Sequence, residues 1–69
     1  TNEREKAERV YRKTIAANPQ SAKAHYYLAV LYWNKDWKKV VEELEIVLSL
    51  DPNYPEAQSY LTRARAYLK

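Results

Sequence analysis

The amino-acid sequence predicts an all-α fold of four helices, and three observations lead to this prediction. Apolar residues recur at helical spacing in four segments, each bounded by Asn, Asp, Ser or Pro. Glycine is absent from all 69 residues, although a β-rich or loop-rich fold normally needs glycine at turns with positive φ. The connections span about two to four residues, and such short loops make successive helices pack antiparallel. A single domain over residues 1–69 is expected.

The first helix is predicted over about residues 3–17. Pro19 stops it, because a residue that precedes proline is pushed away from helical ψ. Acidic residues stand four positions before basic ones in Glu5–Arg9 and Glu8–Arg12, and each such pair adds about 0.2–0.5 kcal/mol to a helix. One apolar face is expected at helical pitch, made by Ala7, Val10, Tyr11, Thr14 and Ile15.

The second helix is predicted over about residues 22–34, with Ser21 as its N-cap. It carries two apolar stripes instead of one. Such a helix is either buried between two neighbours or offers an apolar surface to a ligand. The inner stripe consists of His25, Leu28, Ala29 and Tyr32, and the second stripe consists of Tyr26, Val30 and Trp33.

The third helix is predicted over about residues 37–50. Asn34 lies in the preceding turn, where Asn tolerates the left-handed conformation that ends helices, and Asp36 is the expected N-cap. Glu42, Glu43 and Glu45 lie mostly off the core face. That face is expected to consist of Trp37, Val40, Val41, Leu44, Val47 and Leu48.

The fourth helix is predicted over about residues 54–68. Asn53 followed by Glu56 resembles a capping box, and Pro55 suits a first helical turn. The inward residues are expected to be Ala57, Tyr60, Leu61, Ala64 and Leu68.

The four segments also repeat. Pro19 and Pro52 lie 33 residues apart, and each follows a pair of apolar residues at matching distances, Ala7 with Tyr11 and Val40 with Leu44. A period in this range is typical of helical repeat arrays. Such arrays build extended binding surfaces.

The spacing resembles the tetratricopeptide repeat family, whose unit is a helix hairpin of about 34 residues. Residues 22–54 match one unit, with His25, Leu28-Ala29 and Tyr32 in the slots of its first helix and Val40, Leu44 and Pro52 in those of its second. Residues 2–19 and 55–69 match half-units on either side. The chain departs from the pattern where the interval from Tyr32 to Val40 is one residue short and where Arg65 takes a tyrosine slot.

This resemblance implies an α-solenoid that binds a protein, as a peptide or a partner helix, on a concave face. The first helix of each unit lines that face in the family. In some members Lys and Asn on this face hold a peptide carboxylate, but Tyr26 and Val30 occupy the comparable positions here, which disfavours that role. The face would consist of Lys23, Tyr26, Val30, Trp33 and Asn34, joined by Glu56, Ser59, Arg63 and Tyr67.

No catalytic arrangement is visible, so the sequence predicts neither an enzyme nor a cofactor. His25 is the single histidine and cysteine is absent, which leaves no zinc site of the usual kind. Without glycine no phosphate-cradling loop can form. His25 falls in a core position and is expected to be a packing residue.

Two alternatives remain open. One is an engineered or isolated repeat unit with no natural ligand, which could form a homodimer through exposed terminal helices. The weaker one is binding to RNA or an anionic surface, although a net charge of +3 is modest for a nucleic-acid protein. Neither a signal peptide nor a membrane span is expected, and the cytoplasm is the favoured compartment. The cations concerned would be Lys35, Lys38, Lys39, Arg63 and Arg65.

Overall fold

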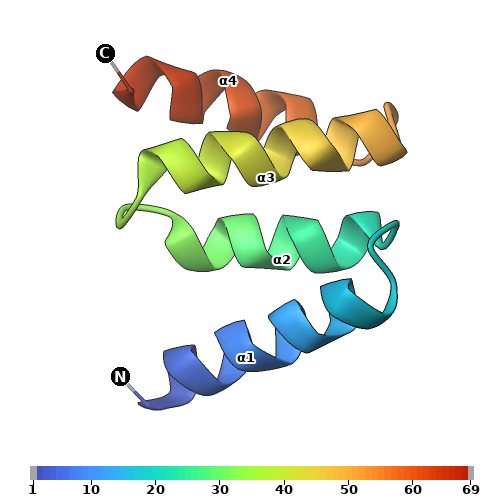
Figure 1. The fold of residues 1–69 in the computed structure, drawn as a ribbon. Helices are drawn as coiled ribbons and strands as arrows, with labels where there is room; N and C mark the ends of the chain where they lie inside the picture. The colour runs from blue at the N-terminus through green and yellow to red at the C-terminus, as the bar shows by residue number, and fades with distance from the viewer. Residues whose placement is uncertain (1, 69) are drawn as a thin grey trace.

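The computed structural model describes residues 2–68, so residues 1 and 69 of the predicted domain lie outside the described part. The helices stack in chain order and alternate in direction, each packed against the next (Figure 1). No strand occurs within residues 2–68, and the prediction of an all-α fold of four helices is confirmed. The helices are α1 (Asn2–Ala17), α2 (Ala22–Tyr32), α3 (Trp37–Leu50) and α4 (Ala57–Tyr67).

The caps of α2 and α3 are those that the sequence predicts. The Ser21 hydroxyl accepts a hydrogen bond from the Ala24 N–H at 3.2 Å, and the Asp36 carboxylate accepts one from the Lys39 N–H, also at 3.2 Å. Asn34 is left-handed, with φ 68°. Helix α2 ends at Tyr32, two residues earlier than predicted, because Trp33 leaves helical geometry (ψ 130°) to enter the turn.

The predicted start of α4 is wrong, because the helix begins at Ala57 and not near residue 54. Glu56 is left-handed with φ 66° and makes no side-chain cap, so the expected capping box does not form. Asp51 organises this turn instead. Its carboxylate accepts the Asn53 N–H at 3.1 Å, and its carbonyl accepts the Tyr54 N–H at 3.0 Å. The Tyr54 ring then packs on α2, which delays the helix.

The core is centred on α3, as its apolar spacing predicts. Val40, Leu44 and Val47 are completely buried or nearly so. They pack with Ala29 of α2 and with residues of α4. Leu68 was expected inside, but it follows the last turn of α4 and is 45% exposed. The buried residues of α4 are Ala57, Leu61 and Ala64.

Helix α1 is held more loosely, since none of its described side chains is fully buried. Val10 and Thr14 of its predicted apolar face are exposed, Val10 to 58%, because no described helix covers that side. Polar contacts replace part of the missing packing. The Tyr32 hydroxyl donates to Glu8 Oε2 at 2.8 Å and accepts from the Arg12 guanidinium at 2.7 Å.

The predicted ion pairs on α1 have different outcomes. Arg12 and Glu8 form theirs at 2.8 Å, while Glu5 and Arg9 are not paired within 4 Å. The hydrogen bond from Tyr32 is the main cause that lowers the pKa of Glu8, and Arg12 lowers it further. These contacts are the only polar side-chain link between α1 and α2 in the described part of the chain.

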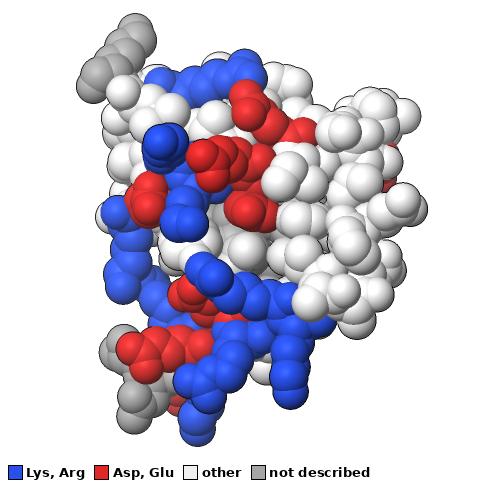
Figure 2. Space-filling model, viewed as in Figure 1, with Lys and Arg blue, Asp and Glu red and all other residues white. Residues whose placement is uncertain are grey.

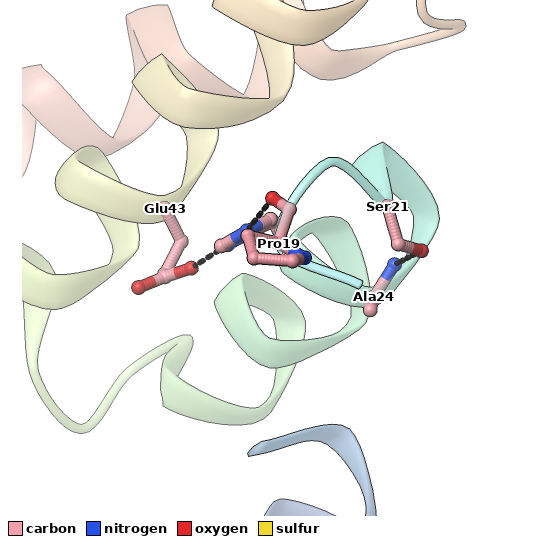
Figure 3. A network of polar contacts seen from close by, with 5 residues as sticks. Pro19, Ser21, Ala24 and Glu43 are labelled. Carbon is pink, nitrogen blue, oxygen red and sulfur yellow. Dashed lines mark hydrogen bonds and ion pairs between the residues drawn. The ribbon is translucent and has the colours of Figure 1, made fainter. Parts of the chain in front are cut away.

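A second polar link ties α2 to α3 and to the preceding loop. His25 is 6% exposed, as its core position predicts. Its Nδ1 contacts Glu43 Oε1 at 2.6 Å, and its Nε2 contacts the Pro19 carbonyl oxygen at 3.1 Å (Figure 3). Both partners are oxygen acceptors, so both hydrogen bonds are formed together when each ring nitrogen carries a proton. The role of Glu43 was not predicted.

The outer edge of α4 is polar. Gln58 Nε2 donates to the Thr62 hydroxyl at 3.4 Å, and Arg65 forms an ion pair with Glu45 of α3 at 2.8 Å. Arg65 is exposed on this edge.

Leu28→Ala should cost about 2–5 kcal/mol, because Leu28 is 5% exposed and its truncation leaves a cavity. Denaturant unfolding followed by circular dichroism measures this loss. Val30→Ala on the same helix is the control, since Val30 is 50% exposed and its loss should cost far less. Equal effects of the two substitutions would contradict the described packing.

Glu43→Ala should destabilise the fold by about 1–3 kcal/mol, because it leaves a buried imidazole nitrogen without its partner. The neighbouring and exposed Glu42 provides the matched control, and Glu42→Ala should stay within about 0.5 kcal/mol of the wild type. The same unfolding measurement compares the two. A neutral Glu43→Ala variant would mean that the contact with His25 contributes nothing.

Candidate binding groove

A cavity of about 300 Å³ opens between α2 and α4, with α3 at its base. Three residues that the sequence analysis assigned to a binding face, Tyr26, Val30 and Trp33, line it together. Tyr26 and Val30 stand at i and i+4 on α2, so the helix presents both along one side, and Trp33 follows directly after the last residue of α2. The remaining lining residues are Ala29, Leu44 and Tyr60. The cavity and these six residues are called the groove below.

The walls of the groove are fixed by contacts between aromatic rings. Tyr60 of α4 meets Trp33 edge to face, with centroids 5.5 Å apart, and lies 6.2 Å from Tyr26. Trp33 also meets Trp37 edge to face at 4.6 Å, and Tyr26 lies 5.0 Å from Tyr54. Centroid separations of about 4.5–7 Å are favourable for such rings. Tyr26 and Trp33 are thus each supported by a further ring outside the groove, Tyr54 and Trp37.

The lining residues of the groove differ in how much of their surface is exposed to solvent. Tyr26 and Trp33 are half-buried, because their rings pack on neighbours, while Val30 is 50% exposed. The sequence left burial and ligand binding as alternatives for this stripe of α2. In the structure, the rings of Tyr26 and Trp33 pack against neighbouring rings and also border an open apolar hollow.

Few polar groups reach the groove. The Trp33 indole N–H has no hydrogen-bond acceptor within residues 2–68, yet it is not buried, so it is available to a ligand. The hydroxyl of Tyr26 lies near that of Tyr60 and meets no carbonyl or carboxylate acceptor in the described part. Burial is the main cause that raises the pKa of Tyr26, and the charges of Tyr60 and Glu56 raise it further.

Arg63 lies beside Tyr60, one of the lining residues of the groove. Its guanidinium lies over the Tyr60 ring, 5.9 Å from the centroid, in a cation–π contact. The ion pairs of the described residues do not include Arg63. Its charge is therefore available at the rim of the groove.

The other predicted site residues lie outside the groove. Lys23 is turned toward α1, with its Nζ 5.7 Å from the Tyr27 ring centroid, and it lines a separate hollow between α1 and α2. Asn34 is taken up by the left-handed turn, and Ser59 is exposed on α4. Tyr67 stacks on Trp37 at 4.4 Å instead of entering the groove.

Three lining residues were not assigned to the binding face, because the sequence analysis placed them in the core. Ala29 and Leu44 do pack in the core, but they also form the base of the groove. Tyr60 stands one 33-residue period after Tyr27. Both tyrosines turn toward an earlier helix, Tyr27 to Tyr11 and Tyr60 to Tyr26. The 33-residue period could therefore have indicated that Tyr60 packs toward α2, as Tyr27 packs toward α1.

Charged side chains of both signs gather over α1 and over α3 on the face that Figure 2 shows. The part of this face near the loops that precede α2 and α4 is largely uncharged. Among the cations considered for an RNA surface, Arg65 is paired with Glu45, and Lys39 lies over the Tyr32 ring at 5.7 Å. A patch of one sign is not visible on this face.

Residues 2–68 contain neither a metal-binding cluster nor a membrane-spanning helix. No three His, Asp or Glu side chains gather so that they could hold a metal ion. No helix there has both the length and the apolar character that crossing a membrane requires.

Stability should fall as the pH rises above about 10, because folding raises the pKa of Tyr26, Tyr54 and Tyr32. A raised pKa stabilises the protonated folded state below the unfolded pKa of about 10 and loses this contribution once the folded protein ionises. Tyr26→Phe should reduce the loss, measured by urea unfolding between about pH 8 and 11.5. Tyr67→Phe, at a side chain 62% exposed, is the control. Equal pH dependence in both variants would contradict the burial of Tyr26.

Comparisons with protein-family models, with curated proteins and with solved structures give no match. The functional interpretation of the chain therefore depends on the geometry of the groove and on the sequence pattern.

Proposed function

We propose that the chain is a protein-interaction module that binds an extended peptide or a partner helix in the groove between α2 and α4. One observation carries the proposal. A hollow of about 300 Å³, bordered by Tyr26, Trp33 and Tyr60, stays open although these are large apolar side chains that a small core would normally bury. Ligand pockets start at about this volume and are mainly apolar with a few polar groups.

The residue types of the groove favour a protein partner. Trp, Tyr and Arg dominate the hot spots of protein interfaces, and they do so in apolar hollows bordered by polar groups. Trp33 and Tyr60 form the walls, and Arg63 stands at the rim. Val30 contributes an aliphatic surface that is half exposed to water and that a partner would cover.

The resemblance to the tetratricopeptide repeat belongs to this proposal. The order of the helices, the caps at Ser21 and Asp36 and the 33-residue interval between Pro19 and Pro52 support it. In that interpretation, α2 and α4 are the first helices of successive units, and their side chains line the same concave face. The proposed role is binding without catalysis.

A second candidate is a repeat unit without a ligand that associates with its own copies. The exposure of Val10 on α1 favours it, since an uncovered apolar side chain on a terminal helix invites pairing. Sedimentation at rising concentration would then give a mass above 8.2 kDa. A constant mass would remove this candidate and leave the groove as the functional surface.

Val30→Glu should abolish peptide binding without unfolding the chain. It places a charge in the apolar groove at a side chain that is already half exposed, and the lost burial alone corresponds to about tenfold weaker binding. A library of extended and helical peptides, titrated into the chain and followed by amide chemical shifts, measures the effect.

Ile46→Glu on α3 is the matched control, because Ile46 is a similarly exposed aliphatic residue outside the groove. It should leave binding unchanged. If no library peptide shifts the amides of Tyr26, Val30 and Trp33, the groove is not a peptide site and the proposal fails.

A further inference from the structure

The hydrogen-bond groups of the groove restrict the kind of peptide that it can take. Among its polar side-chain groups, the Trp33 indole N–H makes no hydrogen bond within residues 2–68, while the hydroxyls of Tyr26 and Tyr60 lie near each other. The indole can only donate, whereas a hydroxyl can donate or accept. No carboxylate side chain is part of the lining. The unpartnered indole N–H therefore favours a partner that supplies an acceptor.

The three regular backbone conformations differ in what they supply. A helical partner has its carbonyls bonded internally and would leave the Trp33 N–H unmatched. A β-strand exposes N–H groups that need an exposed sheet edge, and residues 2–68 contain no strand. A polyproline II segment has no internal hydrogen bonds, so its carbonyls are free, and its prolines have no N–H to satisfy.

The charges at the rim of the groove favour a bound peptide with an acidic residue at the end that lies near Arg63. Arg63 is the unpaired cation of the described α4, and Glu56 stands seven residues before it, about 10 Å along the helix axis. A segment with an acidic residue at its Arg63 end pairs with the cation and stays away from Glu56. Because a polyproline II chain rises about 3.1 Å per residue, that acid falls about two or three residues from a proline seated beside Tyr60.

We propose that the groove binds a proline-rich polyproline II segment that carries an acidic residue next to its prolines, with the prolines between Tyr26, Trp33 and Tyr60 and the acid on Arg63. This rests on the proposed function and specifies its partner. Apolar aromatic grooves are the surfaces on which proline-rich segments dock in other peptide-binding domains. A proline-rich segment loses little conformational entropy on binding, because it is already extended in solution.

Three capped synthetic peptides test the proposal on the full chain. The first has four prolines followed by two glutamates, the second has four prolines followed by two lysines, and the third is an alanine-based helix with two glutamates. The first should shift the amides of Tyr26, Val30 and Trp33 and the Trp33 indole N–H. The second should bind up to about fivefold more weakly, which is the range of an exposed ion pair.

Arg63→Ala should remove the difference between the two proline peptides, while Arg65→Ala on the other edge of α4 should keep it. Tyr26→Phe retains the ring and loses the hydroxyl, and should weaken both proline peptides by about two- to tenfold. Binding that survives Val30→Glu would place the peptides outside the groove and overturn the assignment.

The outcomes separate this assignment from the proposed function. If the helical peptide binds in the groove and the proline peptides do not, the polyproline assignment is wrong and the peptide-binding function stands. If neither these peptides nor any library peptide binds there, both are wrong.

Discussion

Helix α3 has a neighbour on either side, and the molecule is held together by the burial of its apolar face against both of them. Val40, Leu44 and Val47 expose at most 1% of their surface, and burying such side chains contributes about 1.5–3 kcal/mol each. A domain of this size has a net stability of only about 5 kcal/mol. Neither α2 nor α4 alone could cover α3, so both must be in place before the fold is stable.

The position of the groove follows from this packing. With α3 behind them, α2 and α4 meet only through long side chains, and here these are aromatic. Tyr26, Trp33 and Tyr60 bridge the interval without filling it. The Tyr60 ring is tilted against Tyr26 and meets Trp33 edge to face, and the three rings border the open hollow. Leu44 closes the bottom and completes an apolar hollow. The same rings thus join the two helices and create the opening between them.

Local features of the fold could be predicted from the sequence because the interactions that set them span only a few residues. Ser21 and Asp36 cap the helices that follow them, each through a partner three residues on, and Asn34 itself adopts the left-handed conformation of its turn. The start of α4 could not be predicted in this way. Tyr54 packs on Tyr26, far away in the sequence, and this contact overrides the capping pattern of Asn53 and Glu56.

The candidate site was predictable to the same degree. The spacing of Tyr26, Val30 and Trp33 on one helix revealed one wall of the groove. The opposite wall and the base required knowledge of how helices meet, and so did the direction of Lys23 toward α1. The partnership of His25 with Glu43 was hidden for the same reason, since 18 positions separate them and nothing in either local pattern connects them.

Helix α1 is packed less tightly than the other three helices, so the stability of the molecule is not uniform along the chain. The buried cluster draws its members from α2, α3 and α4, whereas α1 depends on Tyr11 against Tyr27 and on the exposed contacts of Tyr32. Segments with few buried contacts open at a smaller free energy than the rest of a domain. Detachment of α1 would uncover the side of α2 that carries Tyr27, whereas the residues that line the groove belong to α2, α3, α4 and the turn after α2. Opening at the amino-terminal end therefore leaves the groove in place.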